Sequence, residues 1–128
     1  MPNKQTIYLI GNPIMPEDSL PHVFGPRLKK DFPEIIFDEL DSVDEIPYDD
    51  LLILVDIVKG IKHVTTFDDV NDFADVPNYS LHDFDLGTTL KILKKFGKLK
   101  KVLIIGVPGE MERQEEIYTE LVTRICDL

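Results

Sequence analysis

Short hydrophobic runs divide the chain into predicted β-strands. The clearest run is residues 51–55, LLILV, and similar runs occupy residues 6–10, 34–40 and 101–107. Apolar runs of this length, bounded by turn-forming or acidic residues, are typical of strands that are buried in a parallel sheet. A shorter strand is also predicted at residues 78–82.

Hydrophobic positions with helical spacing predict two helices, at about residues 86–96 and 111–126. Their apolar faces consist of Leu86, Leu90, Leu93 and Phe96, and of Met111, Tyr118, Leu121, Val122 and Ile125. Residues 20–31 are a weaker helix candidate, because this segment contains two prolines and a glycine.

The alternation of strands and helices predicts a single α/β domain over residues 1–128. The stretch between residues 57 and 75 has a mixed pattern that fits neither a strand nor a helix throughout. Thr66 or Asp68 is a candidate N-cap for a short helix at 67–73. Because the strands are continuously apolar, we expect a mostly parallel sheet that is covered on both faces. Such sheets place their functional sites at the carboxyl ends of the strands, so the residues there are the candidates for function.

The charge of the chain limits its partners. The 128 residues include 14 lysines and arginines against 24 aspartates and glutamates, which gives a net charge of −10. A domain this acidic repels phosphate backbones and anionic lipid surfaces, so we expect neither nucleic acid nor a membrane as partner. Metal cations and basic peptide segments are better candidates.

Other features indicate a cytoplasmic protein. No apolar run exceeds five residues and no secretory signal opens the chain, so no transmembrane span is expected. The single cysteine, Cys126, allows no internal disulfide and is expected to be packed in a helix. His22 and His63 have no special placement, and we expect both to be structural.

Three polar residues near the ends of predicted strands are candidate metal ligands. Asp18 closes the loop GNPIMPED, Asp56 follows LLILV, and His82 ends the segment 78–82. Ordinary roles are also open, because Glu17 and Asp18 can cap a helix and Asp56 can cap a turn. If the three side chains meet at one edge of the sheet, they would hold a divalent cation and leave coordination positions open. An open shell suits a metal that arrives with another molecule, or one that binds a reacting water.

The order of the motifs resembles that of the hydrogenase maturation endopeptidases. These metal-dependent proteases remove a C-terminal extension from the large subunit of nickel–iron hydrogenases after nickel insertion. The motifs are GN…ED, LLILVD, SLHDFDLGTTL and VLIIGVPGE, and they extend over nearly the whole chain. The resemblance implies a three-layer α/β/α sandwich of the phosphorylase/hydrolase-like kind. Its mixed five-stranded sheet would be mostly parallel, with an antiparallel fourth strand.

The resemblance also implies roles for individual residues. The catalytic residues, which are also the metal ligands, would be Asp18, Asp56 and His82. The residues that recognise the substrate would be Asp38, Gly11 and Asn12. The metal would be nickel supplied by the substrate, the precursor of the hydrogenase large subunit, and another divalent cation could bind the isolated protein.

The chain departs from the family pattern at several places, among them SLPHVFG, where the family usually has glycine at the start of the helix. Leu9 stands where the first glycine of Gly-x-Gly-Asn is usual, and Glu39-Leu40-Asp41 follows Asp38 in place of Gly-Gly-Thr. Without those glycines the loop is less able to approach a peptide closely, which motivates an alternative function as a non-catalytic chaperone for the metal-loaded subunit. A flavodoxin-like domain that binds a nucleotide or another small ligand is a third possibility, disfavoured because the acids of GNPIMPED repel phosphate.

Overall fold

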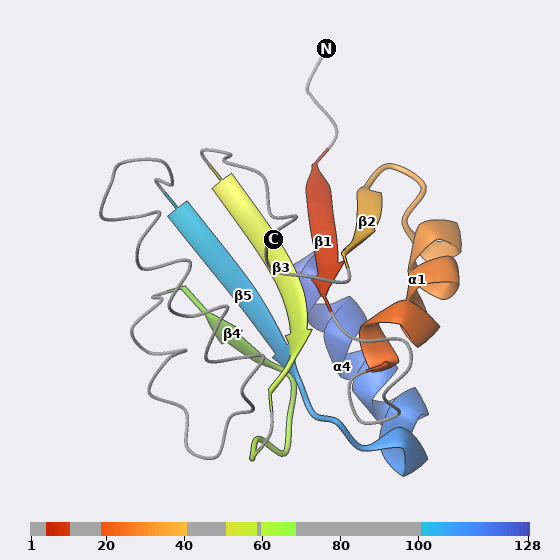
Figure 1. Ribbon diagram of the computed structural model, residues 1–128. Helices are drawn as coiled ribbons and strands as arrows, with labels where there is room; N and C mark the ends of the chain where they lie inside the picture. Colours follow the sequence, from red (N-terminus) through yellow and green to blue (C-terminus); the bar gives the residue numbers. More distant parts are fainter. Residues whose placement is uncertain (1–4, 11–18, 41–50, 59, 69–100) are drawn as a thin grey trace.

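Five strands form one mixed sheet in the order β2-β1-β3-β5-β4. The computed structural model of the chain describes residues 5–10, 19–40, 51–58, 60–68 and 101–128 (Figure 1). The strands are β1 (Thr6–Ile10), β2 (Ile36–Leu40), β3 (Leu51–Ile57), β4 (Thr65–Phe67) and β5 (Lys101–Val107). Strand β4 pairs antiparallel with β5 at one edge, and the other pairings are parallel. The expected mixed, mostly parallel sheet with an antiparallel fourth strand is confirmed.

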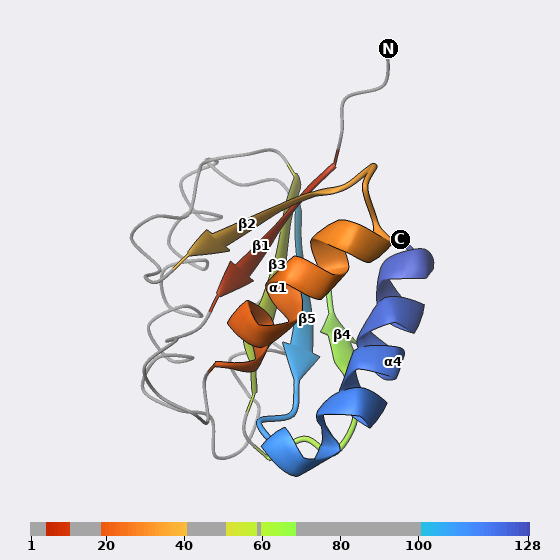
Figure 2. The same cartoon turned by 90° about the vertical axis from the view of Figure 1, so that its right-hand side faces the viewer.

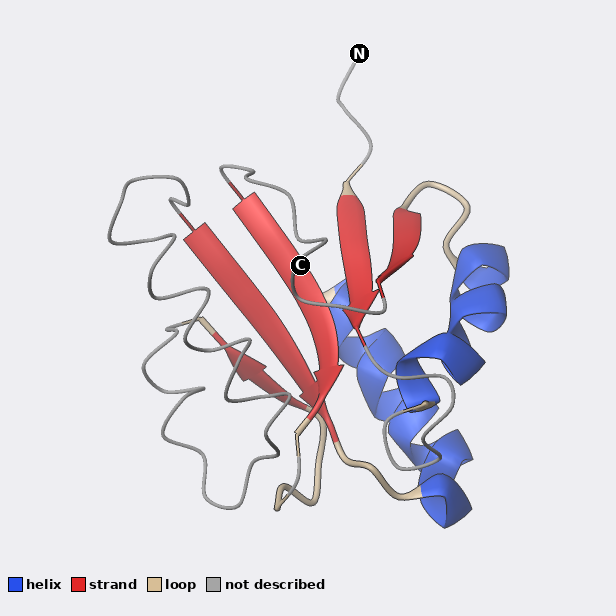
Figure 3. Ribbon diagram, viewed as in Figure 1, coloured by secondary structure: helices blue, strands red, loops and turns tan. Residues whose placement is uncertain are grey.

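Two helices pack on the same face of the sheet. They are α1 (Leu20–Asp31) and α4 (Gln114–Cys126), and α4 is preceded by a 3-10 turn at Met111–Arg113. Figures 2 and 3 show the two helices side by side on this face. The buried side chains that join helices and sheet include Leu20, Phe24, Leu28, Ile117, Leu121, Ile125, Ile7, Leu9, Ile53, Val55, Ile105 and Val107. Within the described residues, no helix is both long and apolar enough to cross a membrane.

The opposite face of the sheet is also buried. Alternate residues of the strands form a second apolar cluster there, which includes Tyr8, Ile10, Leu40, Leu52, Leu54, Val102 and Ile104. Successive side chains of a strand point to opposite faces, so strands that are apolar at every position require cover on both sides. The burial of both faces agrees with the predicted three-layer arrangement.

Helix α1 forms although it contains two prolines. Pro21 lies in the first turn, where its missing N–H costs no helical hydrogen bond. Pro26 lies inside the helix and is exposed, so its ring points away from the core. Leu20, Phe24 and Leu28 stand four residues apart and bury one continuous stripe against the sheet. This burial outweighs the low helix propensity that weakened the prediction.

Two predictions around the middle of the chain are wrong. Strand β3 continues to Ile57, so Asp56 lies inside the strand and not after it. Thr66 and Phe67 belong to β4, where a helix start had been expected. Pairing with β5 decides this structure, and a three-residue strand is too short to show periodicity in the sequence. The predicted strand 78–82, the predicted helix 86–96 and most of the predicted helix 67–73 lie outside the described residues.

The C-terminal helix agrees with its prediction at most of the positions expected to be buried. Tyr118, Leu121 and Ile125 are buried as expected, together with Ile117. Val122 is only partly buried, and Met111 is exposed in the 3-10 turn. Cys126 is exposed, which corrects the expectation that it is packed.

Tyr118 links α4 to α1 through several contacts. Its ring lies 5.2 Å from that of Phe24 and beneath the guanidinium of Arg27, which is 3.9 Å from the ring centroid. The Tyr118 hydroxyl donates a hydrogen bond of 2.6 Å to Asp31. Arg27 also pairs with Glu115 at 2.8 Å. Burial, followed by the hydrogen bond to Asp31, raises the pKa of Tyr118 above its ordinary value.

Because this pKa is raised on folding, Tyr118 should make the stability of the protein fall in alkali. The contribution is fully present below the unfolded pKa of about 10 and is lost as the pH rises towards the folded value. Tyr118→Phe should cost about 1 kcal/mol at neutral pH through the lost hydrogen bond, and should show a shallower fall above about pH 10. Urea unfolding at several pH values measures both effects. Parallel stability curves for the two proteins above that pH would contradict this account.

Candidate functional site

The carboxylate of Asp56 is buried in the second-last position of β3. Its side chain is 0% exposed, although its neighbours along the strand are apolar. The Oδ1 atom accepts a hydrogen bond of 2.9 Å from the backbone N–H of Ile57. Burying a carboxylate is costly, so its presence in a central apolar strand calls for a reason beyond packing.

Asp56 lies at the point where the order of the strands reverses. Strand β3 is flanked by β1 and β5, and Asp56 is in register with Ile10 of β1 and with Gly106 of β5. The chain proceeds from β1 to β2 on one side and from β3 towards β5 on the other. In open α/β sheets, ligands bind at the carboxyl ends of the strands beside this switch point. The position of Asp56 is therefore that of a candidate active-site residue.

Strand alternation places Asp56 on the sheet face that is turned away from α1 and α4. Ile53, Val55 and Ile57 pack against the two helices, whereas Leu52 and Leu54 belong to the opposite cluster. Since side chains two residues apart share a face, Asp56 extends the row of Leu52 and Leu54.

Gly106 keeps the region beside Asp56 closely packed. A Cβ atom at this position would lie 2.9 Å from both Phe67 Cε2 and Val58 Cγ2, and 3.4 Å from Ile61 Cδ1. The two distances of 2.9 Å are shorter than normal contacts, so the chain uses glycine here to let the segment after β3 cover β5. The backbone N–H of Val58 also bonds to the carbonyl of Val107 at 2.9 Å. The strand end that carries Asp56 is thereby held against its neighbour.

Asp38 lies on the same sheet face as Asp56 but is exposed. Asp38 of β2 is in register with Tyr8 of β1, and Tyr8 is in turn in register with Leu54 of β3. Leu54 lies two residues before Asp56 in the same strand. Two strand spacings and two residues along a strand correspond to roughly 12 Å between the Cα atoms of the two aspartates. Asp38 is thus too far from Asp56 for the two carboxylates to share an ion.

The other predicted site residues, Asp18, His82, Gly11 and Asn12, lie outside the described residues. The structure does describe the residue before Gly11 and the residue after Asp18. Gly11 follows Ile10, the register partner of Asp56, and Asp18 precedes Ser19, whose carbonyl accepts the hydrogen bond of 3.0 Å from Val23 at the start of α1.

The sequence analysis missed a second group of potential metal ligands. His63, Glu116 and Glu120 offer ligand atoms that all lie within 4.8 Å of one another. The available signal was the pair of glutamates four residues apart in α4, which share a helix face. No local pattern indicated that His63 lies beside them.

His22 has a structural contact, because its Nδ1 lies 3.1 Å from Glu39 Oε1.

The fold agrees with that of known endopeptidases. The hydrogenase maturating endopeptidase HybD from E. coli superposes with a TM-score of 0.61 at 16% identity, over 96% of this chain and 93% of that one. The chain has the fold of a hydrogenase maturation endopeptidase. The solution structure of an endopeptidase from Escherichia coli superposes with a TM-score of 0.57 at 19% identity, over 81% of this chain and 74% of that one. The resemblance indicated by the motifs is therefore confirmed for the endopeptidase fold, whereas no protein-family model and no curated protein matches the sequence.

If Asp56 serves function and not packing, its charge is dispensable for folding. Asp56→Asn keeps the shape of the side chain and an oxygen that can accept the Ile57 N–H. We expect the free energy of unfolding to change by less than about 1 kcal/mol, because the substitution is nearly isosteric and keeps a hydrogen-bond acceptor. Urea denaturation measures it, with Asp127→Asn as an exposed control. A loss of about 3 kcal/mol or more would identify Asp56 as a structural residue.

The close packing at Gly106 gives a second expectation. Gly106→Ala should destabilise the protein by about 1–3 kcal/mol, since Phe67 and Val58 must move. Gly25→Ala is the matched control: its Cβ would meet the end of the Glu39 side chain at 2.9 Å, and alanine favours the helix by up to about 1 kcal/mol. Gly25→Ala should therefore be close to neutral. Equal unfolding midpoints for the two variants would contradict the packing described here.

Proposed function

We propose that the protein is an endopeptidase that removes the C-terminal extension of a nickel-loaded hydrogenase large subunit. Two observations support this proposal. The chain shares its fold with HybD and with the solution structure of an endopeptidase from Escherichia coli. Within that fold, a fully buried carboxylate, Asp56, lies at the carboxyl end of a central strand. The buried Asp56 is the observation that carries the proposal, because it lies at the carboxyl end of a central strand beside the switch point, where α/β sheets bind their ligands.

In this proposal Asp56 shares one nickel ion with Asp18 and His82. The ion belongs to the substrate, where cysteine thiolates hold it, and the three oxygen and nitrogen ligands complete its coordination. Such ligands bind weakly alone and more tightly when soft thiolates supply the rest of the shell. The enzyme would thus recognise nickel loading directly, because a subunit without nickel offers no bridging ion.

The reaction is hydrolysis of one peptide bond. A water oxygen attacks the scissile carbonyl carbon, the C–N bond breaks, and a proton passes to the departing amine. A divalent ion can assist by polarising the carbonyl oxygen or by lowering the pKa of the water. Binding to the ion also holds the scissile bond in a fixed orientation, which reduces the entropic part of the activation barrier.

Other residues would recognise the peptide around the cleavage site. Asp38 is exposed on the same face as Asp56, and its carboxylate suits a basic or hydrogen-bond-donating group of the substrate. Gly11 and Asn12 follow β1, the neighbour of β3, and belong to the same proposed subsite. The net charge of −10 favours a partner that presents a cationic metal centre.

The test uses a nickel-loaded large subunit that still carries its C-terminal extension. Asp18→Asn, Asp56→Asn and His82→Ala should each lower the cleavage rate by about 100-fold or more, because loss of even an outer-shell partner of a metal ligand costs 10- to 100-fold. The mass of the large subunit reports cleavage. Asp127→Asn, an exposed change at the end of α4, should cleave at the normal rate.

Two outcomes would overturn the proposal. Normal cleavage in all three ligand variants would remove the shared metal site. Tight binding of the loaded subunit by the unsubstituted protein, with no change in the mass of that subunit, would instead indicate a chaperone. Unfolding curves of the variants show whether lost cleavage reflects the site or the fold.

A further inference from the structure

A second cluster of metal-ligand side chains lies between α4 and the segment that precedes β4. We propose that His63, Glu116 and Glu120 bind one divalent transition-metal ion of the Zn²⁺ type, and that this ion fastens residues 60–64 to α4. The site is separate from Asp56, whose side chain lies on the sheet face turned away from α4. The inference does not depend on the proposed function.

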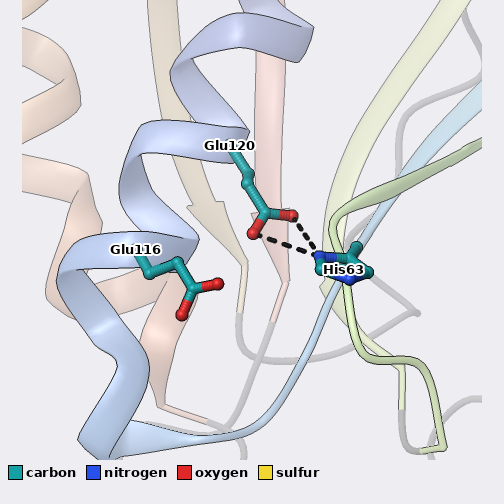
Figure 4. A group of neighbouring side chains, drawn as sticks. All are labelled: His63, Glu116 and Glu120. Carbon is teal, nitrogen blue, oxygen red and sulfur yellow. Dashed lines mark hydrogen bonds and ion pairs between the residues drawn. The ribbon is translucent and has the colours of Figure 1, made fainter.

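The three side chains converge from two elements. Figure 4 shows the Glu116 and Glu120 carboxylates on one side of α4, both directed towards the imidazole of His63. Their ligand atoms all lie within 4.8 Å of one another. Ligand atoms around one zinc ion, at bonds of about 2 Å, are roughly 3–4 Å apart. Small rotations of the exposed Glu116 and His63 side chains are enough to reach this spacing.

The donor set selects the class of ion. One imidazole nitrogen and two carboxylate oxygens suit Zn²⁺ and similar borderline ions, whereas Ca²⁺ and Mg²⁺ prefer oxygen ligands alone. Three protein ligands leave at least one position for water. The imidazole nitrogen therefore distinguishes this site from a patch of carboxylates alone, which would bind calcium or no ion.

Glu120 is already held in position for this role. Its Oε1 accepts a hydrogen bond of 2.9 Å from the backbone N–H of Val64, a buried residue of the core. Its Oε2 lies 3.4 Å from Nδ1 of His63. A metal-ligating carboxylate that also accepts a hydrogen bond is oriented by it, so less ordering is needed on binding. Glu120 and His63 thus form a partly assembled pair to which Glu116 adds the third ligand.

Arg113 competes with a metal ion for Glu116. Its Nε and Nη2 atoms donate hydrogen bonds of 3.0 and 3.1 Å to the Glu116 carboxylate, and Nη2 lies 4.0 Å from Glu120. Arg113 also bonds to Glu110, so it keeps one partner when Glu116 turns to the ion. This exchange predicts that removing the arginine charge strengthens metal binding, which a purely structural ion-pair network would not show.

The bound ion would also affect the residues around Asp56, because the segment that carries His63 packs near them. Ile61 lies two residues before His63 and packs near Gly106, the register partner of Asp56. Gly60, with a φ angle of 89°, forms the turn that lets this segment fold back. Fixing His63 to α4 therefore restricts the segment that covers β5 beside Asp56.

Zinc binding is measured by calorimetry on the metal-free full chain, with Asp56→Asn as the background so that only the second site is counted. We expect one Zn²⁺ per chain. His63→Ala and Glu116→Gln should each weaken binding by about 10-fold or more, since each removes a direct ligand. Glu112→Gln removes an equal charge from the 3-10 turn that precedes α4 and should change the affinity by less than about twofold. Arg113→Gln should tighten binding by up to about fivefold.

Nuclear magnetic resonance of the histidine imidazoles identifies the ligand. Addition of Zn²⁺ should shift the His63 ring resonances at one equivalent, and heat unfolding should move to higher temperature in proportion to zinc saturation. Equal zinc affinity in the His63→Ala, Glu116→Gln and Glu112→Gln variants would overturn the proposal. Unchanged His63 resonances at saturating zinc would do the same.

Discussion

The burial of one carboxylate in an apolar strand is the constraint from which the candidate site follows. Asp56 is fully buried in β3, among side chains that form two apolar clusters. A charge in this position weakens the core unless another group compensates it, and a cation is the strongest such group. Its place at the carboxyl end of β3, beside the switch point of the sheet, suits a residue that meets a metal ion which another molecule brings.

The sheet supplies the geometry that this role requires. Four parallel strands end at one edge, and the order of strands reverses between β1 and β3, next to Asp56. The helices α1 and α4 cover the other face, which is secured by Tyr118 and its contacts with α1. The face that carries Asp56 and Asp38 is therefore kept separate from the face on which α1 and α4 pack.

Strands with continuous apolar runs could be predicted from the sequence alone, and β1, β3 and β5 lie where the pattern indicated. Helix α1 was uncertain because local propensity penalises Pro26, whereas burial of Leu28 and its neighbours decides the structure. Strand β4 could not be predicted, since three residues gain their structure from pairing with β5. Asp56 could be singled out as a candidate because it follows an apolar run, although the structure places it within the strand. The nearness of His63 to Glu116 could not be predicted, because a contact across 53 positions leaves no trace in local spacing.

The central claim is that Asp18, Asp56 and His82 share one ion, and anomalous diffraction from crystals of the protein soaked with Zn²⁺ tests it most directly. The account predicts a peak about 2.0–2.2 Å from a carboxylate oxygen of Asp56, with Asp18 and His82 at similar distances. A peak at His63 would belong to the second site and would not bear on this claim. Well-ordered density for the three residues with side chains too far apart to contact a common atom would contradict it.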